Sequence, residues 1–143
     1  MLPFCDSPVP VYEQITEHLS ALVASGAYRP GEAIPSIRTL AARLVVNPNT
    51  VQRTFQELER LGVIEMRRGL GAFVAPQGDV AARALGDRAV YARFLQGIHL
   101  GRTSQLPDRD ICSIFSRAFD TTKDAGSGRA PLGGVESKAE NKV

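Results

Sequence analysis

The feature that most constrains this sequence is a short helix with both ends marked, followed at once by a glycine-punctuated hairpin. Asn47 can cap the helix, Pro48 suits its first turn because no N–H donor is needed there, and Gly62 can end it. The helix carries an apolar face formed by Val51, Phe55 and Leu58. Its ends are therefore determined by local chemistry, before any tertiary contact is considered.

A second short helix precedes this one. Ser36 is a suitable N-cap for a helix that runs to about Leu44, with Ile37, Leu40 and Leu44 facing inward. About three residues separate the two helices, which is the spacing of a helix-turn-helix. After Gly62, the runs VIEMR and GAFVA flank RGLG, and the glycines predict a β-hairpin rather than a helix.

The N-terminal segment completes a small domain. A helix is expected to begin near Pro10, with an apolar stripe at helical spacing formed by Val11, Ile15, Leu19, Leu22 and Val23. Ala33 and Ile34 leave room for a very short strand. The order helix, short strand, helix, helix, hairpin predicts a winged helix-turn-helix over residues 1–76.

Beyond Pro76 the pattern is purely helical until the composition changes near the C-terminus. Two stretches match the apolar spacing of amphipathic helices, at Tyr91, Phe94, Leu95 and Ile98 and at Ile111, Ile114, Phe115 and Ala118. A hairpin of two helices cannot bury both stripes, so residues 77–120 are predicted to form a dimerisation region. Residues 121–143 are rich in Gly, Ser, Lys and Glu and are predicted to be a disordered tail. The predicted fold class is mainly α with a small β-hairpin wing (α+β).

Composition excludes several classes of protein. A hydrophobic fraction of 43% with 22% charged residues is ordinary for a globular chain. No run of about 18 apolar residues could span a membrane, and the N-terminus lacks the basic and apolar regions of a secretory signal, so a cytoplasmic protein is expected. In residues 1–76, seven arginines are balanced by seven carboxylates. A case for nucleic-acid binding must therefore rest on where the charges lie.

Catalytic and metal chemistry find little support. The two histidines, His18 and His99, lie on different predicted helices, and no catalytic triad or metal-ligand spacing is present. Cys5 and Cys112 are far apart and show no CxxC spacing. The glycines after Arg68 do not have the spacing of a phosphate-binding loop. We therefore expect no enzyme activity, no metal and no cofactor.

The leading end of the helix at Asn47 offers a different chemistry. It carries the polar residues Pro48, Asn49, Thr50, Gln52 and Arg53. In a helix-turn-helix, such N-terminal residues contact base edges in the major groove. Asn and Gln pair with adenine, Arg pairs with guanine, and Thr reaches a phosphate or a thymine methyl. Simple capping is the alternative for Asn47 and Pro48, and an ordinary solvated face is the alternative for Gln52 and Arg53.

Further arginines lie where a DNA backbone would pass. Arg38 follows the cap of its helix by two residues, where it could contact a phosphate beside the helix N-terminus; a plain surface arginine is the alternative. Arg67 and Arg68 stand directly before Gly69, so the tip of the hairpin would carry positive charge on a backbone that can approach DNA closely.

These segments together resemble a known family. The pieces RPGE, PSIRTLA, NPNTV, ELERLG and RRGLGAFV, within residues 8–75, are similar to the winged helix-turn-helix of GntR-type bacterial transcription regulators. The resemblance implies DNA contacts at Arg38, around Asn49, Thr50, Gln52 and Arg53, and at Gly69. Two departures are Thr39, in place of the usual acidic capping-box residue, and Pro48, where many relatives carry a DNA-contacting arginine.

The length beyond Pro76 indicates a branch of that family. About 45 structured residues are too few for a large effector domain and fit the YtrA-like subfamily, whose short helical region dimerises the protein. The resemblance implies a homodimeric repressor of a palindromic operator, often for transporter genes. A winged helix that binds a protein partner instead of DNA is the alternative. The sequence identifies no small-molecule effector, and a site between two subunits stays open.

Overall fold

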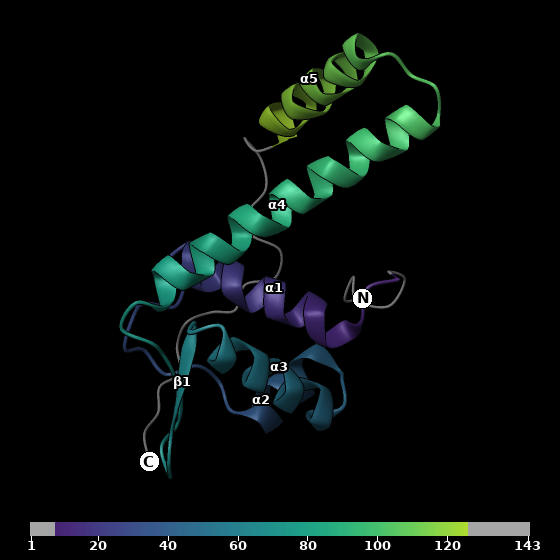
Figure 1. Cartoon of the computed structure of the whole chain (residues 1–143). Helices are drawn as coiled ribbons and strands as arrows, with labels where there is room; N and C mark the ends of the chain where they lie inside the picture. The colour runs from purple at the N-terminus through teal and green to yellow at the C-terminus, as the bar shows by residue number, and fades with distance from the viewer. Residues whose placement is uncertain (1–7, 126–143) are drawn as a thin grey trace. The chain divides into compact units, whose positions relative to one another are not determined.

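A computed structural model describes residues 8–125 as five helices and one two-stranded antiparallel hairpin (Figure 1). The elements are α1 (Val11–Ala24), α2 (Ile37–Leu44), α3 (Pro48–Arg60), β1 (Ile64–Arg67), β2 (Gly71–Val74), α4 (Gly78–Thr103) and α5 (Asp108–Ala125). The predicted fold class is confirmed. None of the described helices is long and apolar enough to cross a bilayer.

The helix ends form where their capping residues predicted them. The Ser36 hydroxyl accepts a hydrogen bond from the Thr39 N–H at 3.2 Å and caps α2. Thr39, which replaces the usual acidic residue of a capping box, contributes its own hydroxyl, 2.9 Å from that of Ser36. The Asn47 side chain accepts from the Asn49 N–H at 2.8 Å and caps α3, with Pro48 in the first turn. Both predicted caps are confirmed.

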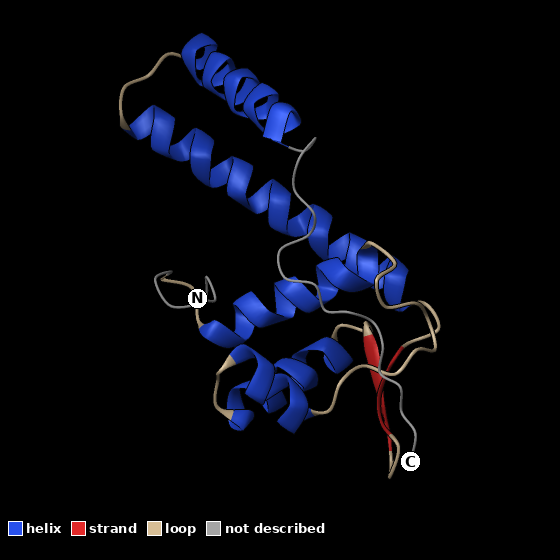
Figure 2. Ribbon diagram, turned by 180° about the vertical axis from the view of Figure 1, so that it is seen from behind, coloured by secondary structure: helices blue, strands red, loops and turns tan. Residues whose placement is uncertain are grey.

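The core of the winged helix lies between α1, α2, α3 and the hairpin, which are drawn together in Figure 2. Side chains from the predicted apolar faces fill it, and seven of them are almost completely removed from solvent: Ile15, Leu19, Val23, Leu40, Val51, Phe55 and Leu58. Val11, Leu22, Ile37 and Leu44, which were also predicted to face inward, are only partly buried. Burial of this many aliphatic and aromatic side chains is the main stabilising contribution to a domain of this size.

The hairpin is the wing. β1 and β2 pair antiparallel with Ile64 opposite Val74 and Arg67 opposite Gly71, which leaves residues 68–70 as the tip. The very short strand predicted at Ala33 and Ile34 is present as a single bridge from Ala33 to Phe73. Gly69 has a φ of +77°, a conformation that glycine adopts without strain.

The described chain divides into two compact units, and the division along the chain falls between Arg93 and Phe94. The first unit extends past Pro76, the predicted end of the winged helix, because the first turns of α4 pack on its core. Ala82 is 1% exposed and Leu85 lies against the same cluster. An ion pair at 2.8 Å between Arg93 on α4 and Glu17 on α1 adds a polar contact.

In the second unit, the helices carry aromatic residues that contact each other. The Phe94 and Phe115 rings meet edge to face with their centroids 5.2 Å apart, and Phe119 stacks on Phe115 at 6.0 Å. Helix α5 continues to Ala125, so residues 121–125, which were predicted to be part of a disordered tail, are helical. The side-chain hydroxyl of Thr121, for example, donates a hydrogen bond to the Arg117 carbonyl of the same helix at 2.8 Å. The prediction for residues 126–143 lies outside the described residues.

Candidate nucleic-acid interface

Helix α3 buries one face and exposes the opposite one. Val51, Phe55 and Leu58 are at most 3% exposed. Asn49, Gln52, Arg53 and Gln56 recur at helical spacing on the exposed side. Three of these four were predicted as contact residues. Gln56, one turn further along, shares the exposed face and was not predicted, although its position follows from the same periodicity. The exposed face is polar and able to donate or accept hydrogen bonds along its length.

The helix is anchored at its middle by a buried threonine. Thr54 is fully buried, and its hydroxyl lies 3.1 Å from the Thr50 carbonyl and 3.2 Å from the Tyr12 carbonyl of α1. The second contact ties α3 directly to α1. Because Thr54 sits one residue after Arg53, this bond limits the movement of the turn that presents the predicted base-contacting residues.

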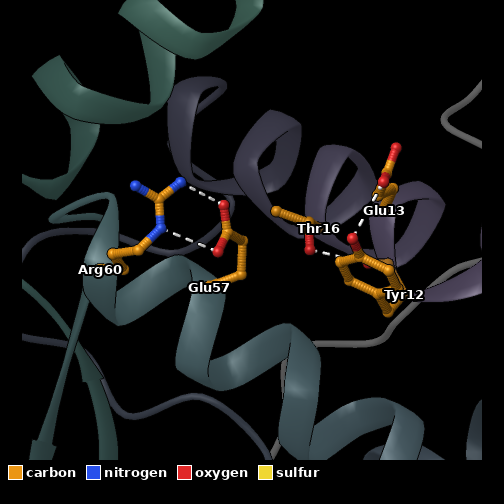
Figure 3. A network of polar contacts seen from close by, with 5 residues as sticks. All are labelled: Tyr12, Glu13, Thr16, Glu57 and Arg60. Carbon is orange, nitrogen blue, oxygen red and sulfur yellow. Dashed lines mark hydrogen bonds and ion pairs between the residues drawn. The ribbon is translucent and has the colours of Figure 1, made fainter.

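Tyr12 also contacts the exposed face of α3, which the sequence analysis missed. The Arg53 guanidinium carbon lies 3.9 Å from the centroid of the Tyr12 ring. The Tyr12 hydroxyl donates to the Glu13 carboxylate at 2.9 Å, and its carbonyl accepts from the Thr16 hydroxyl at 2.7 Å (Figure 3). The hydrogen bond to Glu13 raises the pKa of the Tyr12 hydroxyl above its ordinary value. The ring beneath Arg53 is therefore neutral at physiological pH.

A shallow depression of about 340 Å³ lies between the leading ends of α1 and α3. It is lined by Val11, Tyr12, Asn49, Thr50 and Arg53. The structure thus brings together three of the predicted contact residues, Asn49, Thr50 and Arg53, and adds two from α1. Gln52 shares the exposed face of α3, whereas Arg38 and the wing arginines stand on other elements.

The arginines of the first unit differ in whether a carboxylate already pairs with them. Arg60 is paired with Glu57 through two hydrogen bonds, one of 2.9 Å from its Nε (Figure 3), and these hold the pKa of the Glu57 carboxyl below its usual value. Arg38, Arg53 and Arg68 form no ion pair within residues 8–125. All three are exposed. Their charges, like those of the other exposed and unpaired arginines of the first unit, are available to an anionic partner.

The two wing arginines differ. The Arg67 side chain donates to Glu65 at 2.6 and 2.9 Å, and its guanidinium lies 4.2 Å from the centroid of the Phe73 ring. Arg68 is exposed at the tip beside Gly69. Leu70, also at the tip, is 72% exposed and was not predicted as a site residue. Of the two predicted arginines, Arg68 is the one whose charge is not already matched by a carboxylate.

Asn47 and Pro48 have the structural roles that were the alternative to DNA contact, as cap and first-turn residue of α3. Both are exposed, so capping does not prevent a second role. Among the described residues, no three His, Cys, Asp or Glu side chains are grouped to hold a metal ion. A surface at a helix N-terminus that carries hydrogen-bonding groups and positive charge is suited to bind nucleic acid, whose phosphates are negatively charged and whose base edges donate and accept hydrogen bonds.

Known proteins share this domain. The uncharacterized HTH-type transcriptional regulator YhcF of Bacillus subtilis is 42% identical over 74 residues, which are 52% of this chain and 61% of YhcF. The HTH-type transcriptional repressor YtrA of the same organism is 44% identical over 69 residues, covering 48% of this chain and 53% of YtrA. The chain therefore spans only part of the length of these curated relatives.

A solved structure resembles the chain over a longer stretch. A GntR family transcriptional regulator from Listeria monocytogenes is 26% identical and superposes with a TM-score of 0.68, covering 78% of this chain and 97% of that one. The matched proteins are named regulators, so the comparisons agree with the prediction that the chain is not an enzyme. The model of the bacterial regulatory proteins of the gntR family matches residues 11–74, which run from the first residue of α1 to the last residue of the wing. With its winged helix, its cap residues and its relatives in agreement, residues 11–74 form a winged-helix domain of the gntR family, and over this domain the chain is similar to YtrA.

Proposed function

We propose that the protein is a sequence-specific DNA-binding transcriptional regulator that acts as a homodimeric repressor on a palindromic operator. The observation that carries this proposal is the exposed face of α3, where Asn49, Gln52 and Arg53 project from a helix anchored by Thr54. Such a helix places base-contacting groups in the major groove. The Arg68 charge and the Gly69 backbone supply the contact of the wing with the sugar-phosphate backbone, and Arg38 contacts a phosphate.

The repressor assignment follows the name of YtrA, and genes for a transporter are our proposal for the regulated locus, as the subfamily resemblance implies. A protein with this role acts on the chromosome, so we place it in the cytoplasm. The alternative, a winged helix that binds a protein partner, does not explain why Arg53 and the amide side chains of α3 stand exposed on one helix face, together with unpaired arginines such as Arg38 and Arg68.

The dimer is supported by the apolar side chains of the second unit. Phe94, Leu95, Ile98, Ile114 and Phe115 are each 38 to 49% exposed. A two-fold interface would cover them, since closed C2 dimers are the commonest soluble oligomers. Two recognition helices related by that axis would contact half-sites about 10 base pairs apart on one face of the DNA.

Selection of bound sequences from a random DNA pool tests the proposal and returns the operator. The selected sequence should be an inverted repeat, and its affinity should fall with salt with a log-log slope of roughly −5 if about six phosphates are neutralised. Failure to enrich any sequence, or an affinity that does not change with salt, would favour the protein-binding alternative.

Variants of the selected complex test the roles of single residues. Gln52→Ala should relax preference at particular positions, by about 1 to 3 kcal/mol if the contact is bidentate. Arg68→Ala should weaken binding to selected and random DNA alike. Equal losses for both variants on both DNAs would contradict the division between base contact and backbone contact.

A further inference from the structure

We infer that Tyr12, on α1 and outside the helix-turn-helix, determines specificity by positioning Arg53 for contact with a guanine. This inference rests on the DNA-binding function proposed above and adds a residue to it. Tyr12 is a positioning residue: it acts through the arginine that it supports, and its contribution appears at the base pair that Arg53 contacts.

The stacking geometry leaves Arg53 free to bind. At 3.9 Å from the ring centroid, the guanidinium carbon lies within contact distance of the aromatic face. The N–H donors of a guanidinium lie in its plane, so the edge that pairs with O6 and N7 of guanine is not consumed by a ring beneath the face. No hydrogen bond or ion pair to another described side chain occupies Arg53.

Tyr12 is itself held in place from several directions. Its carbonyl accepts hydrogen bonds from Thr16 on α1 and from Thr54 on α3, and its hydroxyl donates to Glu13. Arg53 and Thr54 are adjacent, so the leading end of α1 contacts the same turn of α3 through both a side chain and a backbone carbonyl. An arginine supported in this way loses less side-chain entropy when it pairs with a base than a freely moving one.

The depression between α1 and α3 makes room for the partner. Asn49, Thr50 and Arg53 line it together with Val11 and Tyr12, so the supported guanidinium borders an open space beside two other predicted contact residues. The opposite hypothesis is that stacking withdraws Arg53 from DNA. The two hypotheses predict opposite signs when the ring is removed.

The test is a double-mutant cycle on the selected operator. Arg53→Ala first identifies the G·C pair whose preference depends on Arg53, with an expected loss of discrimination there of about five- to a hundredfold. Discrimination at that pair is then measured for the wild type, Tyr12→Phe, Tyr12→Leu and Tyr12→Leu combined with Arg53→Ala. All of these keep the Tyr12 backbone carbonyl, and thermal melts establish that each variant is folded.

Tyr12→Leu should reduce discrimination at the Arg53-dependent pair by about two- to fivefold and leave other positions unchanged. Tyr12→Phe, which keeps the ring, should stay close to the wild type. In the Arg53→Ala background, Tyr12→Leu should have no further effect, because the group that it positions is gone.

Three results would overturn the inference while leaving the proposed function intact: tighter binding by Tyr12→Leu, an equal loss at every operator position, or an Arg53→Ala variant that keeps the wild-type preference at every pair. A wild-type protein that enriches no sequence from the pool would overturn the proposed function, and this inference with it.

Discussion

The two units of the chain have similar helical apolar patterns in sequence but bury them to different degrees. In the first unit, Ile15 is fully buried and Phe55 is 3% exposed. In the second unit, Phe94 and Phe115 are each 48% exposed even though their rings contact one another. Amphipathic periodicity therefore predicts which face of a helix will be covered, but not whether the same chain supplies the cover. The first unit covers its own faces, whereas the second exposes the kind of surface that a second copy would bury.

The largest difference should appear when one phenylalanine is truncated in each unit. Phe55→Ala should lower the free energy of unfolding by about 3 to 5 kcal/mol, because it leaves a cavity in a filled core. Phe119→Ala, at a side chain that is 52% exposed, should cost only about 1 kcal/mol in an isolated protomer. Urea titrations at several protein concentrations measure both. A Phe119→Ala cost that grows with protein concentration would place that ring in an interface between copies.

A charge placed on the exposed apolar surface should separate the two copies. Leu95→Glu should produce a monomer and weaken binding to the full palindrome by about 100-fold or more, because the second half-site is no longer tethered. Leu100→Glu on the same helix is the matched control: Leu100 is 67% exposed and lies outside the predicted stripe. Sedimentation velocity with DNA titration decides between them. A Leu95→Glu protein that remains dimeric would remove this stripe from the interface.

Two glycines of α4, one in each unit, differ in how closely other atoms pack against the helix backbone. At Gly78, an added Cβ would collide with the Val63 carbonyl oxygen and lie 2.8 Å from a methyl group of Val74. At Gly97, it would meet nothing within 4 Å. Gly78→Ala should therefore destabilise the protein by about 1 to 3 kcal/mol, as overpacking does. Gly97→Ala should stabilise α4 by up to about 1 kcal/mol, since alanine is the better helix former. Thermal melts showing the same sign for both variants would contradict the proposed difference in packing.

Features that depend on residues close together in the sequence could be predicted, whereas features that depend on tertiary contacts could not. The ends of α2 and α3 depend on Ser36, Asn47 and Pro48 acting on the next few residues, and they were predicted correctly. The stacking of Tyr12 on Arg53 depends on how α1 packs across α3, so no local pattern reports it. Likewise, the engagement of Arg67 by Glu65 and Phe73 depends on the hairpin register.

The extent of the first unit shows the same limit. The change in composition after Pro76 predicts a boundary there, and this boundary stays a prediction, but Ala82 beyond it packs in the core of the first unit. A small side chain such as that of Ala82 adds little to the apolar periodicity of a helix. The residues that bury it come from other parts of the chain. The roles of Arg38, Gln52 and Gly69 at DNA stay predictions, since exposure makes a contact possible without identifying the partner.

The smallest expected effect is that of removing the Ser20 hydroxyl, one of two buried hydroxyls in the first unit that differ in their hydrogen bonds. Ser20 on α1 lines a groove of about 800 Å³ between α1 and α4, and its hydroxyl is buried with no hydrogen-bond partner in the described structure. Thr54 on α3 is equally removed from solvent but is bonded to two carbonyls. Ser20→Ala should therefore raise the free energy of unfolding by about 0.5 to 1 kcal/mol, because an unsatisfied polar group leaves the interior and alanine favours the helix. Thr54→Val should lower it by about 1 to 3 kcal/mol, because it removes a satisfied hydroxyl and leaves the Tyr12 carbonyl with one donor fewer. Paired urea titrations measure both shifts. A loss of stability in Ser20→Ala would mean that the hydroxyl has a hydrogen-bond partner in solution, such as a water held in the groove, and would contradict this prediction.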